Sequence, residues 1–130
     1  MNTKRILVVD DETAITRLLK LNLEKTGRYV VLIENAGANV CAVAQQFKPD
    51  LVLLDVMMPD MDGGDVVNAL RLDPELQNIP VIFLTAAVKQ EEIGTRQGLI
   101  GGFHYIAKPL DLEGIIAAIN RHLEAHAQAD

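Results

Sequence analysis

The chain has 130 residues, of which 49% are hydrophobic and 23% are charged, a composition typical of a globular protein rather than a disordered one. The length predicts one domain over residues 1–130, large enough to bury a core without disulfides or metal staples. The net charge of −6 argues against direct binding of nucleic acid, because affinity for phosphate backbones depends on clustered Lys and Arg.

The first part of the chain alternates short apolar runs with segments of helical periodicity. The run over 4–9 predicts a buried strand, and the next segment predicts a helix from Thr13 that stops at Gly27. A second strand is expected over 29–33 and a second helix over 38–47. The apolar positions of the first helix are Ile15, Leu18, Leu19 and Leu23, and those of the second are Val40, Ala44 and Phe47.

The unbroken apolar run over 51–54 is the central element of the predicted alternation of strands and helices. It is too short for an isolated helix, so it predicts a strand buried on both faces, with Asp55 at its carboxyl end. Pro59 lacks an N–H and ends any regular structure, and Asp60 and Asp62 are expected to be turn residues. Asp55 should therefore lie at the lip of a loop, where ligands bind in open α/β sheets.

The second half continues the alternation. It predicts a third helix that ends before Pro74, a fourth strand over 79–84 and a fifth strand over 103–107. A weaker helix is expected around 89–98, and Asp111 should cap a last helix. The apolar positions of the third helix are Val66, Val67 and Leu70, and those of the last are Leu112, Ile115, Ile116, Ile119 and Leu123.

Five strands alternating with five helices predict an α/β fold, a doubly wound parallel sheet covered on both faces. All strand carboxyl ends then meet at one edge, which would carry Asp10, Asp11, Asp55, Thr85 and Lys108. Three converging carboxylates repel one another by several kcal/mol unless a cation lies between them. Because all the ligands are oxygens, the pattern favours Mg²⁺.

This constellation suits the transfer of a phosphoryl group. The metal and Lys108 would neutralise the incoming group, and the Asp55 carboxylate would attack phosphorus in line to form an acyl phosphate. The Thr85 hydroxyl can donate to a phosphoryl oxygen. If Thr85 moves inward to do so, it leaves space that the Tyr105 ring can fill, which gives the two-state element that a switch requires.

The motifs together resemble the receiver domains of two-component response regulators. The likeness rests on V-V-D-D-E at 8–12, L-L-D-V-M-M-P-D-M-D-G at 53–63, P-V-I-F-L-T-A at 80–86 and Y-I-A-K-P at 105–109. The resemblance implies a flavodoxin-like sheet of five strands in the order 2-1-3-4-5. It also implies Mg²⁺, or Mn²⁺, on Asp10, Asp11, Asp55 and the backbone carbonyl of Met57.

The same resemblance assigns the remaining roles and the partners. Asp55 would be the phosphoacceptor, Thr85 the switch hydroxyl, Tyr105 the rotating aromatic and Lys108 the lysine that pairs with phosphate. A sensor histidine kinase or a histidine phosphotransfer protein would supply the phosphoryl group, and phosphorylation would alter the face formed by helix four, strand five and helix five. The protein would phosphorylate and dephosphorylate itself without turning over an external substrate, as a monomer or weak homodimer.

The single cysteine and the absence of an apolar leader favour a cytoplasmic protein without membrane association. Cys41 falls in an apolar helical pattern and cannot form an internal disulfide. The apolar run after Arg5 is too short for a signal peptide, and no segment has the length to span a bilayer. An unidentified downstream protein would receive the signal, whether the chain stands alone or is a piece of a longer regulator.

Three other functions fit the sequence less well. A nucleotide-binding flavodoxin-like or Rossmann-like module needs a Gly-rich first turn, whereas this chain has acids there. A phosphatase with an aspartyl nucleophile needs a second Asp two residues later as general acid, and Met57 occupies that position. A receiver-like module that only binds partners would not need the full set of acids together with Thr85 and Lys108.

Overall fold

The strands and helices follow the apolar pattern of the chain closely. The computed structural model describes residues 3–85, 99–100, 103–107 and 111–129. The strands are β1 (Lys4–Val9), β2 (Tyr29–Glu34), β3 (Leu51–Asp55), β4 (Val81–Thr85), β5 (Leu99–Ile100) and β6 (Phe103–Ala107). The helices are α1 (Thr13–Lys25), α2 (Val40–Phe47), α3 (Gly63–Leu72) and α5 (Leu112–Ala129), and a short 3-10 turn, η1, spans Gly37–Asn39.

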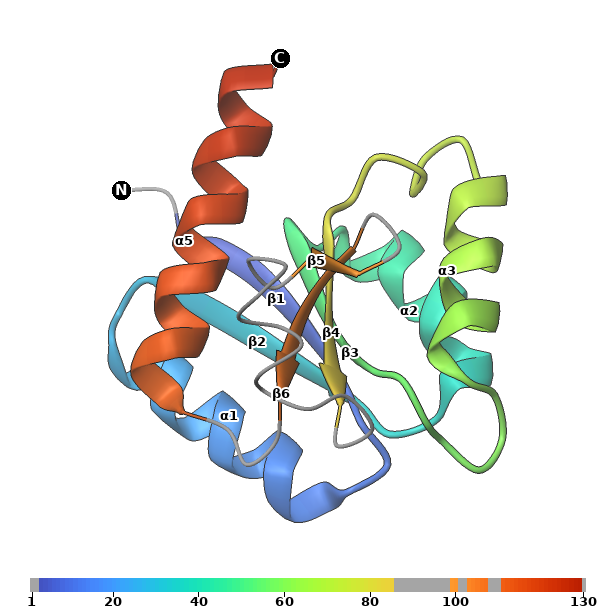
Figure 1. Ribbon diagram of the computed structural model, residues 1–130, viewed down its shortest axis with the longest axis horizontal. Helices are drawn as coiled ribbons and strands as arrows, with labels where there is room; N and C mark the ends of the chain where they lie inside the picture. Colours follow the sequence, from blue (N-terminus) through green and yellow to red (C-terminus); the bar gives the residue numbers. More distant parts are fainter. Residues whose placement is uncertain (1–2, 86–98, 101–102, 108–110, 130) are drawn as a thin grey trace.

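The described strands form one sheet in the order β2-β1-β3-β4-β6-β5. The five longer strands are parallel, so the predicted order 2-1-3-4-5 is confirmed, with β6 as the fifth predicted strand (Figure 1). The additional strand β5 pairs antiparallel with the first residues of β6 and was not predicted. Two residues are too few for apolar periodicity to reveal a strand.

Some element boundaries differ from the predicted ones. The fourth strand begins at Val81 rather than at residue 79, because Pro80 has no N–H to donate and only its carbonyl accepts a hydrogen bond, from the Val52 N–H at 3.0 Å. The second helix begins with η1 rather than directly as an α-helix. The helix expected around 89–98 lies outside the described residues.

Alternate residues of the central strands point into two separate cores. In β1, Ile6 and Val8 join the core beneath α1 and α5, whereas Leu7 and Val9 join the core beneath α2 and α3. Figure 1 shows the corresponding layers, with α1 and α5 on one side of the sheet and α2 and α3 on the other. The sheet is therefore covered on both faces along its centre, as the continuous apolar runs predict.

The apolar face of α1 differs from the predicted one at one position. Leu18 belonged to the predicted apolar set, yet its side chain is 60% exposed, while Leu19 and Leu23 are buried. Thr16 is only 1% exposed and lies on the buried side, one turn before Leu19. Its hydroxyl donates to the carbonyl of Thr13 at 3.1 Å, so a polar residue fits there without an unpaired donor.

Candidate functional site

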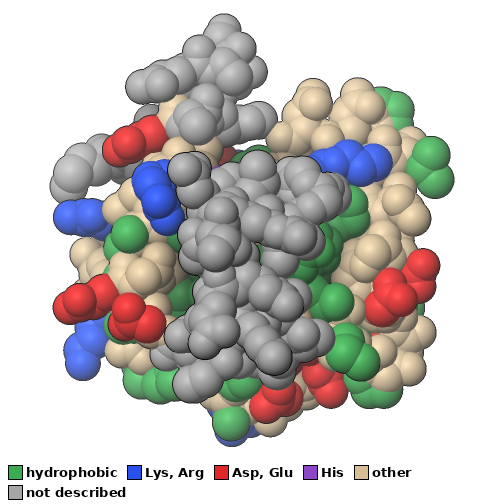
Figure 2. All heavy atoms as spheres, in the orientation of Figure 1, with side chains coloured by type: hydrophobic (Ala, Val, Ile, Leu, Met, Phe, Trp, Pro, Cys, Tyr) green, Lys and Arg blue, Asp and Glu red, His purple; other side chains and the backbone are tan. Residues whose placement is uncertain are grey.

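Three acidic side chains meet at the carboxyl edge of the sheet. The strands β1 and β3 are neighbours with Val9 opposite Leu54, so Asp10 and Asp55 follow at the next position of the same register. One carboxylate oxygen from each of Asp10, Asp11 and Asp55 lies within 4.8 Å of the others. Asp10 is buried, Asp55 is 5% exposed and Asp11 is exposed. Acidic side chains are visible in Figure 2 towards the end at which β4 and β6 terminate.

The donor set at this edge fits a hard divalent cation. It offers carboxylate oxygens only, two of them from buried residues, and their mutual repulsion falls when a cation lies between them. The Asp10 carboxylate is already oriented, because one of its oxygens accepts a hydrogen bond from the Glu12 N–H at 2.9 Å. Mg²⁺ and Mn²⁺ both suit such ligands.

The loop after β3 holds Asp55 in place from its carboxyl side. The Val56 N–H donates to the Leu84 carbonyl at 3.1 Å, which extends the ladder with β4 one residue past Asp55. The Gly63 N–H donates to the Val56 carbonyl at 2.7 Å and closes the loop. Asp62, predicted to be a turn residue, caps α3 by accepting the Asp65 N–H at 2.9 Å. Asp55 therefore sits between a strand and a closed loop.

Asp60 was predicted to be a turn residue, but it also bonds to a segment that is distant in sequence. Its carboxylate accepts hydrogen bonds from the Gly37 N–H at 3.2 Å and the Ala38 N–H at 3.0 Å, which ties the loop after β3 to η1. The hydrogen bond from Ala38 is the main reason that the pKa of Asp60 lies below its ordinary value; slight desolvation opposes it and the Gly37 bond adds to it.

Asp60→Asn is expected to make folding stability less dependent on pH in the acid range. The pKa of Asp60 is lower in the folded state, so the carboxylate contributes stability above its unfolded pKa, and this contribution is lost as pH falls through the folded pKa. Thermal midpoints measured from about pH 7 to about pH 3 should show a gap between wild type and variant that closes on acidification. Glu75→Gln, an exposed acid elsewhere, serves as the control. A constant gap would contradict this explanation.

Thr85 and Tyr105 lie on the same side of the sheet. Thr85 is buried at the end of β4, two residues beyond Phe83, and Phe83 is paired with Tyr105 of β6. The Phe83 and Tyr105 rings are stacked with centroids 5.0 Å apart and planes at 26°. The predicted switch pair therefore shares one face of the sheet, with Phe83 opposite Tyr105 and two residues before Thr85. Lys108 lies outside the described residues.

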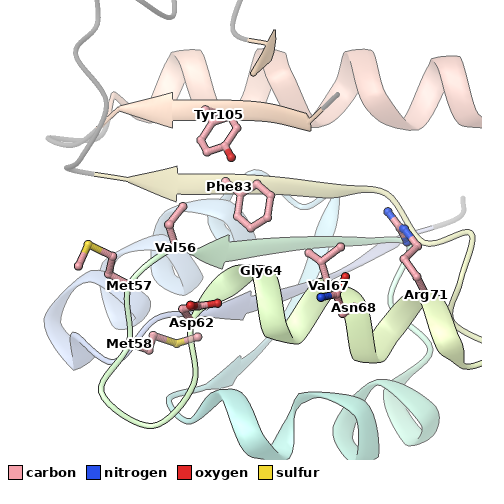
Figure 3. Close-up of a pocket in the computed structure, with 10 residues that line it drawn as sticks. All are labelled: Val56, Met57, Met58, Asp62, Gly64, Val67, Asn68, Arg71, Phe83 and Tyr105. Atoms are coloured by element: carbon pink, nitrogen blue, oxygen red, sulfur yellow. The ribbon is translucent and has the colours of Figure 1, made fainter. Parts of the chain in front are cut away.

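A groove of about 700 Å³ opens beside this aromatic pair. Met57 and Met58 from the loop after β3 line one part of it, and Arg71 from α3 lines another (Figure 3). Figure 3 shows the Phe83 and Tyr105 rings facing each other above α3. Met57, the predicted donor of a backbone carbonyl, follows Asp55 by two residues and has an exposed side chain. The groove thus joins the loop after Asp55 to the side of Tyr105.

One polar residue at this edge was not predicted. Asn35 follows β2, and its side-chain amide donates to the backbone carbonyl of Asp10 at 2.7 Å and to the Thr16 hydroxyl at 3.3 Å. The rule that strand carboxyl ends share one edge applies to β2 as well, so it would have drawn attention to Asn35. The apolar pattern alone gives no sign of a hydrogen bond between two loops.

Across residues 3–85, 99–100, 103–107 and 111–129, no helix is both long enough and apolar enough to cross a bilayer.

Comparison with known proteins places these features in one family. A family model described as the response regulator receiver domain matches residues 6–120. Protein PilH of Pseudomonas aeruginosa is 40% identical over 118 residues, which cover 89% of this chain and 94% of PilH. The DNA-binding dual master transcriptional regulator RpaA of Synechocystis is 40% identical over 120 residues, covering 88% of this chain but only 47% of RpaA. The crystal structure of a response regulator from Desulfuromonas acetoxidans is similar with a TM-score of 0.79 and 27% identity, covering 94% of this chain and 98% of that one.

Proposed function

This chain belongs to the family of response regulator receiver domains, and we propose that Asp55 is the residue through which it accepts a phosphoryl group in a two-component phosphorelay. Members of this family are signalling switches and not enzymes that turn over an external substrate. The observation that supports the role of Asp55 most directly is its burial at 5% exposure beside the Asp10 and Asp11 carboxylates.

The proposed chemistry is an in-line transfer to the Asp55 carboxylate. An Asp55 oxygen forms a bond to phosphorus while the bond from phosphorus to the donor's histidine nitrogen breaks, and that electron pair stays with the imidazole. Asp10, Asp11, Asp55 and the backbone carbonyl of Met57 would hold Mg²⁺. When bound, Mg²⁺ supplies the positive charge that lets the phosphoryl oxygens and the carboxylates share one small space.

Thr85 and Lys108 would convert the modification into a signal. The Thr85 hydroxyl would donate to a phosphoryl oxygen, and Lys108 would pair with another. Movement of Thr85 would change the space available to the Tyr105 ring, which lies on the neighbouring strand and on the same face of the sheet. The face formed by the helix predicted around 89–98, strand β6 and helix α5 would then change and be read by a downstream protein.

A sensor histidine kinase or a histidine phosphotransfer protein is the proposed donor.

RpaA is named as a DNA-binding regulator, and this chain covers 47% of its length, whereas it covers 94% of PilH. The acidic balance of this chain, with a net charge of −6, supports output by protein contact instead of DNA binding. The proposed form is a monomer or weak homodimer.

Acetyl phosphate tests the proposal without knowledge of the natural donor. Incubation with Mg²⁺ should add the mass of a single phosphoryl group, and EDTA should prevent the addition. Hydroxylamine should remove it, since an acyl phosphate is cleaved by this nucleophile and a phosphoserine is not. If no adduct forms with acetyl phosphate or phosphoramidate, while Mg²⁺ still binds, the protein is a receiver-like module that only binds partners.

A further inference from the structure

The turn that carries Asp10 and Asp11 is held by the end of strand β2. The Asp10 N–H donates to the Glu34 carbonyl at 3.3 Å, and the Asp10 carbonyl accepts the Asn35 side-chain amide at 2.7 Å. Both backbone polar groups of Asp10 are therefore bonded to two consecutive residues, Glu34 at the end of β2 and Asn35 directly after it. The position of this buried acid depends on a segment distant in sequence.

The Asn35 amide has a second, buried partner. It donates at 3.3 Å to the hydroxyl of Thr16, which is 1% exposed and itself donates to the carbonyl of Thr13. An amide carries two N–H groups, so Asn35 spans the gap between the backbone of Asp10 and the first turn of α1 with both of its donors. These contacts brace the acidic turn on the side facing away from Asp55.

We propose that Asn35 is a positioning residue for the cation site, a role that rests on the proposed function. Asp10 and Asp11 must hold their oxygens within 4.8 Å of Asp55 against mutual repulsion before a cation arrives. A turn that is free to relax would let these oxygens separate. Asn35 fixes the carbonyl of the peptide that joins Asp10 to Asp11, and thereby keeps both carboxylates near Asp55.

Mg²⁺ titration of the full chain, followed by amide shifts in NMR spectra, tests this role without any phosphoryl transfer. Asn35→Leu keeps a similar volume and removes both donors, so its Mg²⁺ affinity should fall about tenfold, as for other residues that orient metal ligands. The matched control is Asn39→Ala, because the Asn39 amide lies in the same connection but donates to the Glu34 carboxylate at 3.3 Å instead of to the acidic turn. Its affinity should equal that of wild type, and Asp11→Asn should lose most binding.

Measurements of folding stability distinguish a positioning role of Asn35 from a general structural role. Urea unfolding without metal should be measured for the same variants, with Asn35→Ala as a substitute if Asn35→Leu does not fold. A variant that unfolds at lower urea but keeps the wild-type Mg²⁺ affinity would overturn the positioning role. Unchanged affinity at unchanged stability would do so as well. If the wild type itself shows no saturable Mg²⁺ binding, the proposed cation site fails, and that outcome is distinct from a failure of Asn35 alone.

Discussion

Asp55→Asn should yield a folded protein that gains no phosphoryl group from acetyl phosphate and Mg²⁺, under conditions in which the wild type gains one. The amide is nearly isosteric with the carboxylate but has no anionic oxygen to bond to phosphorus, so no acyl phosphate can form. The effect should be a complete loss of the adduct and not a slower rate, which makes it the largest change that any substitution proposed for this site should produce.

The fold should tolerate this substitution well. Asp55 is one of three carboxylates whose oxygens lie within 4.8 Å of one another, so removal of one charge lessens repulsion in the metal-free protein. Thermal unfolding should therefore give a midpoint at or above that of wild type, which shows that the lost adduct does not reflect unfolding. Mg²⁺ should raise the midpoint less than it raises that of wild type, because one ligand charge is gone.

Asp65→Asn is the matched control for the phosphorylation experiment. Asp65 lies in the first turn of α3, exposed and outside the acidic cluster, and the substitution makes the same chemical change. Its adduct should match that of wild type in mass and in Mg²⁺ dependence. An adduct that persists in Asp55→Asn and is lost in another variant would move the phosphoacceptor role to that other residue.

The fold could be predicted because its main determinants are local in sequence. Each central apolar run is a strand whose alternate residues serve two cores, as Val52 and Leu54 serve one and Leu51 and Leu53 the other. The strand order followed from the family resemblance and not from the periodicity. Leu18 was assigned to the wrong face because apolar spacing does not reveal that a hydroxyl, such as that of Thr16, can be bonded inside a core.

The site was predictable only in part, because some of its contacts join loops that are distant in sequence. The rule that strand ends share an edge brought Asp10, Asp11 and Asp55 together, and their clustering is confirmed. Asn35 and the contact of Asp60 with η1 were not predicted, since each acts through a hydrogen bond to the backbone of a different loop. Such bonds depend on how two connections lie in space, and neither periodicity nor turn chemistry reports on that.

Gly63→Ala should lower the free energy of unfolding by about 2 kcal/mol, within the range typical of overpacked sites. A Cβ at this position would lie 2.8 Å from a ring carbon of Phe83, 2.9 Å from the Asp55 carbonyl oxygen and 3.0 Å from the Val56 Cα. Two of these atoms belong to backbone, and the ring is stacked on Tyr105, so none of them can move cheaply. The backbone of Gly63 itself has no positive φ, so the restriction is one of space.

Gly64→Ala provides a control one residue along the same helix. Its Cβ would meet nothing closer than an Asp62 carboxylate oxygen at 3.4 Å, so the ordinary gain of about 0.5–1 kcal/mol for Gly to Ala in a helix should appear. Urea unfolding of both variants measures the difference. Combining Gly63→Ala with Phe83→Leu should recover only part of the loss, because the smaller side chain relieves the ring contact and leaves the contact with the Asp55 carbonyl. Full recovery would assign the strain to the ring alone, and equal stability of the two single variants would show that the loop after Asp55 yields without cost.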